Sequence, residues 1–145
     1  MKIALGSDHG GYALKCDIIQ LLEKLGHEYK DFGCYSTESC DYPDFGEAAA
    51  RAVPPASMIG HRHLHHRHRH LHHRQQGEGH PLRLCGDPFS AEMTRRHNDA
   101  NMLAMGAGIV GPNLAERIVD VFLSTEFEGG RHARRVGLMM DIEKE

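Results

Sequence analysis

The chain has no tryptophan, few aromatic residues and no large excess of charge of either sign. Aromatic residues make up 6% of its 145 residues, and the formal net charge is -3. A chain so close to neutrality has no general attraction for nucleic acid or for an anionic membrane, so we expect neither as a partner. It also lacks any apolar run near the roughly 20 residues that cross a bilayer. Its apolar fraction of 40% is enough for one hydrophobic core, which predicts a single domain.

The cysteines form no Cys-x-x-Cys pair, and no signal peptide precedes the first strand-like run. The four are Cys16, Cys34, Cys40 and Cys85. Both absences predict a reduced protein in the cytoplasm. We interpret all four as small buried or loop thiols, and none is expected to act as a catalytic base.

Residues 53–84 lack the hydrophobic periodicity of the rest of the chain. Nine of the thirteen histidines lie between His61 and His80, with arginine, glutamine and glycine among them. Apolar residues recur there neither at helical spacing nor in strict alternation, and the few leucines bury too little surface to offset the entropy of ordering. We therefore expect a solvated loop.

The residues before this stretch have the pattern of a strand, a helix and a second strand. An apolar run at 2–6 is followed by a polar loop, by apolar residues at helical spacing over 12–25, and by a short strand within 27–33. This order predicts a β-α-β unit with parallel strands. Asp8 and His9 then lie in the loop after the first strand, at the carboxyl end of the sheet, where open α/β folds bind ligands.

Helices and one strand are predicted in the remaining sequence. Asp87 has the character of an N-cap and Pro88 of a first helical residue. The expected elements are a helix from 43 to 52, a helix from 88 to 96, a buried strand from 102 to 110, a helix from 112 to 123, and a last helix after 130 that ends near 145. With these elements alone, the sheet is one or two strands short.

Four ordered motifs resemble a known family. They are GSDHGG (6–11), DYPDFG (41–46), CGDPFSAEMTRRHNDANMLAMGA (85–107) and STEFEGGRHARRVGLMMDIE (124–143). Over 1–52 and 85–145 the chain resembles ribose-5-phosphate isomerase type B, of the family shared with galactose-6-phosphate isomerase subunits. The resemblance implies one Rossmann-like, three-layer α/β domain over 1–145 with a doubly wound parallel sheet. It also implies aldose-ketose isomerisation of a phosphorylated sugar through an enediolate, without metal or organic cofactor, in a homodimer or homotetramer.

The resemblance also implies roles for individual residues. Catalytic roles fall on Asp8 and His97 in ring opening, and on Asn98, which would hydrogen-bond the charge that develops on the substrate oxygens. Substrate-binding roles fall on His9, Arg131 and Arg135 for the phosphate and on Tyr42 for the sugar pocket.

Simpler interpretations of the same residues stay open. Asp8 and His9 fit a helix cap, and His97 with Asn98 fits a solvated polar pair just after a helix. Arg131 and Arg135 fit an exposed helix face, although guanidinium groups four residues apart can also grip a phosphate together. Tyr42, which precedes a proline, also fits ordinary packing.

Where the family has a third strand and a Cys-Gly-Thr-Gly-Ile-Gly loop, this chain has the histidine run. A histidine codon is CA followed by T or C, and the residues that follow these histidines have codons that can begin with C. Read one base later, each such histidine codon therefore gives isoleucine or threonine. In this shifted frame, residues 60–83 permit GIVICTTGIGIS, TANK and IRCA, in register with the family. Residues 55–59, read two bases later, permit GExDR. Three lost bases, near Val53, Gly60 and Leu84, account for both shifts. The sequence therefore indicates that 53–84 is frame-shifted relative to the family.

As written, the chain lacks the family's proton-abstracting residue. Leu64 stands where the family has a cysteine or glutamate base, the residues after it replace the glycine loop that binds the enediolate, and Gly108 stands where the family usually has arginine. Three alternatives therefore remain. They are an isomerase of galactose 6-phosphate or allose 6-phosphate, a catalytically dead family member, and a histidine-rich metal-binding protein.

Overall fold

Parallel strands form the centre of the molecule. The computed structural model describes residues 2–52 and 82–142. Within these ranges, β1 (Lys2–Leu5) pairs in parallel with β2 (Glu28–Asp31), and β3 (Leu82–Leu84) pairs in parallel with β4 (Met102–Ala104). Side chains from β1 and β4 share the same buried clusters, so the two strand pairs belong to one layer.

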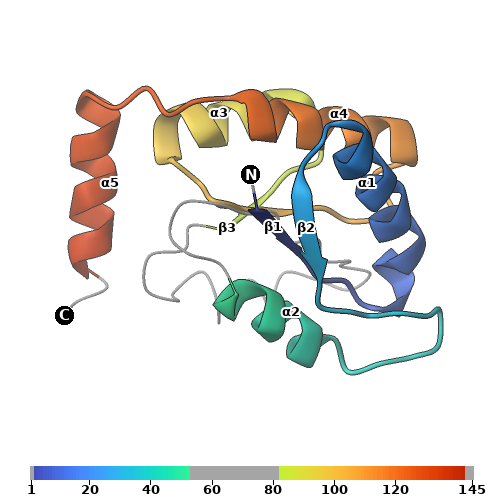
Figure 1. Ribbon diagram of the computed structural model, residues 1–145. Helices are drawn as coiled ribbons and strands as arrows, with labels where there is room; N and C mark the ends of the chain where they lie inside the picture. The colour runs from blue at the N-terminus through green and yellow to red at the C-terminus, as the bar shows by residue number, and fades with distance from the viewer. Residues whose placement is uncertain (1, 53–81, 143–145) are drawn as a thin grey trace.

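Helices cover both faces of this layer, as Figure 1 shows. The helices α1 (Tyr12–Lys24), α3 (Pro88–Asn98) and α4 (Pro112–Ser124) lie over one face, and α2 (Tyr42–Arg51) lies over the other. The last helix, α5 (Arg131–Ile142), stands at one side of the molecule and contacts α3. The predicted three-layer, doubly wound α/β fold is thus confirmed. None of the helices in the described ranges is long and apolar enough to cross a membrane.

Alternation along the strands explains why both faces are covered. Ile3 and Leu5 of β1 point into the larger core cluster with α1 and α4, whereas Ala4 joins a second cluster on the opposite face. In β4, Leu103 joins the larger cluster while Met102 joins the second one. Because successive strand side chains point to opposite faces, a strand that is apolar at every position needs a helix layer on each side.

The predicted β-α-β unit is confirmed. Between β1 and β2 lie a short 3-10 turn, η1 (His9–Gly11), and helix α1, whose Leu14, Ile18 and Leu22 are buried at helical spacing. The helix ends at Lys24, and Gly26, which follows the C-cap Leu25, has a φ of +73°, the left-handed conformation that glycine adopts without strain. This unit places the loop of Asp8 and His9 directly after β1.

Glycine allows α2 to approach the end of β1. A Cβ atom at Gly6 would lie 2.9 Å from the backbone oxygen of Phe45, and one at Gly33 would overlap the ring of the same residue. Gly33 also has a φ of +107°. Close packing of α2 on the strand ends therefore depends on both glycines.

Three predicted boundaries were wrong. Residues 82–84, which were predicted as part of the solvated loop, form β3, and Leu82 is 8% exposed. Strand β4 stops at Ala104, because the chain turns through hydrogen bonds from the N–H groups of Ile109 and Val110 to the Gly106 carbonyl. Helix α3 runs beyond residue 96 to Asn98, so the predicted position of His97 and Asn98 just after a helix was also wrong.

Several predictions fall outside the residues that the structure describes. They concern the solvated loop, the histidine run and the frame-shifted reading, so far as these involve 53–81, and the end of the last helix beyond Ile142. Those predictions stay predictions.

Candidate active site

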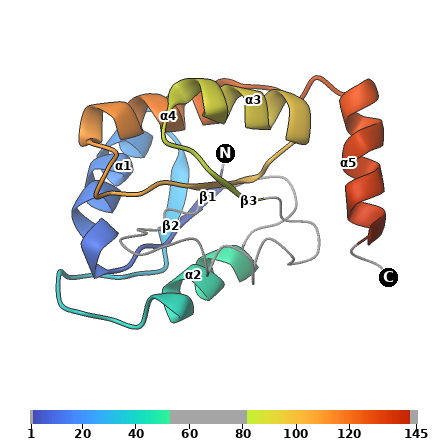
Figure 2. The ribbon, with the colours of Figure 1, turned by 180° about the vertical axis from the view of Figure 1, so that it is seen from behind.

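The predicted site residues lie in two groups on opposite sides of the molecule. Asp8 and His9 lie between β1 and α1, and Tyr42 opens α2. The other group lies at the C-terminal end of α3 and on α5, which Figures 1 and 2 show on the side remote from α1. One copy of the chain therefore does not bring the two groups together.

Asp8 is a buried cap of the turn that starts the first helical segment. Its Oδ1 accepts a hydrogen bond from the Gly11 N–H at 2.8 Å, and the residue is 8% exposed. The predicted capping role is thus present, and it fixes the carboxyl group at the end of β1. Because capping uses one oxygen of the carboxylate, it does not exclude a second role for the group.

His9 joins this turn to the segment before α2. The Cys40 N–H donates to Nδ1 of His9 at 3.4 Å, and the Cys40 Sγ lies 3.8 Å from the same nitrogen. Tyr42 follows two residues later as the first residue of α2. The turn of Asp8 and His9 is thus joined, through Cys40, to the segment that leads into Tyr42.

His97 and Asn98 occupy the last turn of α3. The helix ends because Asp99 adopts a left-handed conformation, with φ 49° and ψ 38°, and its N–H donates to the carbonyls of Arg95 and Thr94. His97 and Asn98 face a shallow groove of about 350 Å³, whose other lining residues are Arg83, Leu84, Cys85, Ser90, Met93 and Thr94.

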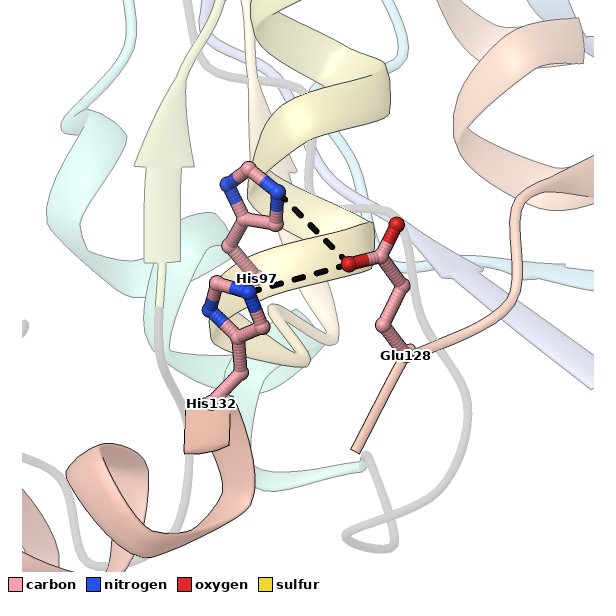
Figure 3. A group of neighbouring side chains, drawn as sticks. All are labelled: His97, Glu128 and His132. Carbon is pink, nitrogen blue, oxygen red and sulfur yellow. Dashed lines mark ion pairs between the residues drawn. The ribbon is translucent and has the colours of Figure 1, made fainter. Parts of the chain in front are cut away.

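The side chains of His97, Glu128 and His132 meet beside this groove, as Figure 3 shows. The two imidazole rings stack with centroids 4.3 Å apart and an interplanar angle of 3°. Oε2 of Glu128 lies 3.8 Å from Nε2 of His97 and 3.7 Å from Nε2 of His132. We call these three residues the His-Glu-His cluster.

Arg96 holds the carboxylate of this cluster in place. Its Nε donates to Oε1 of Glu128 at 2.6 Å, and its Nη2 lies 2.5 Å from the same oxygen. The Glu128 N–H also donates to the Arg96 carbonyl at 3.0 Å. With Oε1 bound by the guanidinium, Oε2 is the oxygen that faces the two imidazoles.

The charges around the cluster favour a carboxylate and a neutral imidazole. The Arg96 guanidinium lowers the pKa of Glu128, with smaller contributions from the two histidines. Burial lowers the pKa of His132, and the positive potential of His97 and Arg131 lowers it further. At neutral pH, Glu128 is therefore ionised and His132 is mainly uncharged.

The two predicted phosphate ligands on α5 are exposed. Arg131 and Arg135 lie one helical turn apart, and Nε of Arg131 is 3.5 Å from Nε2 of His132. The first turns of α5 therefore present two guanidinium groups beside the His-Glu-His cluster. Such a pair can bind the oxygens of a phosphate group.

Glu128 and His132 were not predicted as site residues. The signal for them was weak: a glutamate and a histidine four residues apart, on either side of Gly129 and Gly130, next to the predicted ligand Arg131. Their meeting with His97 depends on how α5 docks against α3, which residue spacing does not show.

The chain is similar to sugar-phosphate isomerases over nearly its whole length. A protein-family model described as Ribose/Galactose Isomerase matches residues 3–59 and 82–139. Ribose-5-phosphate isomerase B of Escherichia coli (strain K12) is 38% identical over 144 residues, with 99% of this chain and 97% of the relative covered. The solved structure of Clostridium thermocellum ribose-5-phosphate isomerase B is 44% identical, with a TM-score of 0.90 and coverage of 99% and 98%. The Mycoplasma genitalium ribose-5-phosphate isomerase B, solved with bound ribulose 5-phosphate, is 31% identical, with a TM-score of 0.90 and coverage of 99% and 97%.

Proposed function

The chain belongs to the ribose/galactose isomerase family, and on that premise we propose that it interconverts ribose 5-phosphate and ribulose 5-phosphate. The observation that carries the proposal is the similarity, over 99% of the chain, to an isomerase solved with bound ribulose 5-phosphate. The reaction is an aldose-ketose isomerisation through an enediolate, and it requires ring opening, proton abstraction and stabilisation of negative charge.

We propose that Asp8 and His97 open the sugar ring. Ring opening moves a proton from the anomeric hydroxyl to the ring oxygen, so it needs one group that accepts a proton and one that donates it. The carboxyl group of Asp8 is fixed at the end of β1, and the imidazole of His97 is half-exposed beside the groove at α3. The imidazole of His97 is therefore open to a ligand, whereas the carboxyl group of Asp8 is buried and held in a fixed position.

Binding and charge stabilisation fall to the other predicted residues. The Asn98 amide borders the same groove as His97 and can donate to the enediolate oxygens. Arg131, Arg135 and His9 would bind the phosphate, and Tyr42 would line the sugar pocket. Neither metal nor organic cofactor enters this scheme.

The scheme requires a second copy of the chain. Because Asp8 and His9 lie on one side of the molecule and His97 with α5 on the other, a complete site forms only where two copies meet. Exposed apolar side chains on α5 support such an interface, since Leu138 is 58% and Met139 47% exposed. We propose a homodimer or homotetramer on these grounds.

We propose the cytoplasm as the location. A sugar phosphate is charged and does not cross a bilayer unaided, so the enzyme must share a compartment with the reactions that make and use it.

The group that abstracts the proton is missing from the written sequence. The family position of the base holds Leu64, which has no titratable group, and the described turn after β4 holds an exposed Gly108 in place of the usual arginine. Loss of a single oxyanion donor costs about 2.7 to 4 kcal/mol of transition-state stabilisation. We therefore expect full activity only from a chain in which the segment 53–84 is translated in the shifted frame. We call it the re-read chain. The chain as written is expected to turn over slowly or not at all.

A substrate panel tests the proposal. Ribose 5-phosphate, galactose 6-phosphate and allose 6-phosphate are given at equal concentration to the folded re-read chain, and the ketose product is measured. We expect the highest kcat/KM with ribose 5-phosphate. A higher value with another aldose phosphate would overturn the substrate assignment, and no turnover by a folded protein would overturn the reaction.

A further inference from the structure

We propose that the His-Glu-His cluster is a binding site for a divalent transition-metal ion, with zinc as the probe. His97, Glu128 and His132 each offer one ligand atom, and these atoms all lie within 4.8 Å of one another. Two imidazole nitrogens and one carboxylate oxygen form a typical three-residue zinc set, which leaves a fourth position for water or a ligand. No metal belongs to the proposed isomerase reaction, so this site is an addition to it.

To hold an ion the two rings have to unstack, because an imidazole nitrogen binds a metal in the plane of its ring and the two planes are parallel here. Zinc binds nitrogen and oxygen at about 2.0 to 2.2 Å, which places tetrahedral ligand atoms about 3.4 Å apart. The stacked rings already present their Nε2 atoms to the same oxygen of Glu128, at 3.8 and 3.7 Å (Figure 3). The side chains of His97 and Glu128 are 39% and 37% exposed and can rotate, whereas that of His132 is 12% exposed and stays fixed.

Neighbouring residues orient the ligands as they do in established metal sites. Arg96 binds Oε1 of Glu128 and is itself held by Glu92, whose Oε1 lies 2.9 Å from Nη1 of Arg96. This chain of contacts directs Oε2 at the imidazoles before any ion arrives. Such outer contacts raise metal affinity because the ligand atoms are already ordered.

Positive charge nearby limits the affinity. Nε of Arg131 lies 3.5 Å from Nε2 of His132, so the guanidinium has to turn away before the nitrogen can bind an ion. Arg131 is exposed on the first turn of α5 and can do so. The negative charge of Glu128 offsets part of the repulsion, and we expect weaker binding than at a closed site with four protein ligands.

Metal binding would have a consequence for catalysis. A bound ion would occupy the Nε2 lone pair of His97, so that this nitrogen could no longer accept or donate a proton. Zinc would therefore act as an inhibitor of ring opening. This consequence rests on the proposed function, but the binding itself does not, because the three ligands are present whatever the reaction is.

The test has to separate this cluster from the histidines of 61–80, which are also able to bind zinc. Crystals of the full-length chain are soaked in zinc chloride, and anomalous difference density is measured at the zinc absorption edge. We expect a peak bonded to Nε2 of His97, Nε2 of His132 and a carboxylate oxygen of Glu128. In Glu128→Gln the peak should disappear, whereas in the control Glu126→Gln, an exposed glutamate two residues earlier, it should stay.

A measurement in solution tests the same site if crystals do not form or if Glu128→Gln does not fold. Zinc is titrated into 15N-histidine-labelled protein, and the imidazole nitrogen shifts of His97 and His132 are followed, with His27, in the turn between α1 and β2, as the control. Changes at His97 and His132 that saturate together support the site. Zinc density or shifts confined to other histidines, or a peak at the cluster that persists in Glu128→Gln, would overturn the proposal.

Discussion

Cys85 lines the same groove as His97, yet its thiol is unsuited to replace the missing base. Burial raises the pKa of Cys85 to about 11, and the nearby Asp87 carboxylate adds to the effect. At pH 7 only about one thiol in ten thousand is then a thiolate, the form that abstracts a proton. The prediction that no cysteine among the four is the base agrees with this chemistry for Cys85.

This thiol should resist alkylation. In the folded chain at pH 8, iodoacetamide is expected to modify Cys85 at least tenfold more slowly than in urea, where all four thiols are exposed. Peptide mass spectrometry over a time course gives both rates. Equal rates in folded and unfolded protein would show that the groove does not bury this sulfur.

Lys15 is fully buried, and its ammonium group is satisfied by three oxygens. Its Nζ donates to both carboxylate oxygens of Asp31 at 2.7 and 2.8 Å and to the Cys34 carbonyl at 2.6 Å. Removing the charge in Lys15→Met leaves the Asp31 carboxylate without its charged partner, and we expect a loss of about 3 kcal/mol in the free energy of unfolding. Urea titration measures it. The control Lys24→Met, exposed on the same helix, should change stability by less than about 0.5 kcal/mol, and similar losses in both variants would refute this role.

Helices were easier to predict than strands, and the reasons lie in particular residues. In α1, Leu14, Ile18 and Leu22 repeat at helical spacing over three turns, so many residues carry the signal. By contrast, β3 has only three residues, and its Arg83 and Leu84 are not buried, so nothing in its sequence marks it as a strand. The end of α3 depends on the left-handed Asp99, a conformation that glycine or asparagine would have signalled more clearly.

The N-terminus of α3 was predicted correctly, and its cap can be tested. Asp87 accepts hydrogen bonds from the Ser90 N–H at 2.8 Å and the Ser90 hydroxyl at 2.7 Å. Asp87→Ala should cost about 1 kcal/mol in the free energy of unfolding, since the first turn loses its acceptor. Asp87→Asn keeps an acceptor oxygen and should retain most of the stability. Equal losses of stability in Asp87→Asn and Asp87→Ala would mean that the negative charge of Asp87, and not its capping hydrogen bonds, stabilises the helix.

At the scale of the whole molecule, the family motifs predicted more of the site residues than hydrophobic periodicity and residue spacing did. The motifs located Asp8, His97 and the arginines of α5, but single residues at 97, 128 and 132 give no sign that they converge. The separation of the two residue groups likewise appears only once the chain is folded, because it depends on where α5 lies relative to α1.

Association of two copies should depend on the apolar face of α5. Leu138→Glu places a charge on a side chain that is 58% exposed in the single chain, and we expect the dissociation constant to rise at least tenfold, or about 1.4 kcal/mol. Sedimentation velocity over a concentration series measures it. The control Leu25→Glu lies at the end of α1, remote from α5, and should leave association unchanged. A monomeric parent protein would contradict the interface directly.

The central claim is that this fold serves ribose 5-phosphate isomerisation and that the written residues 53–84 remove the base. The most direct measurement is the rate of ribulose 5-phosphate formation by two folded proteins of verified intact mass, the chain as written and the re-read chain. We expect turnover by the re-read chain and a rate at least about 100-fold lower for the written one, since base and oxyanion donors are lost together. Equal rates, or a folded re-read chain with no turnover, would contradict the account.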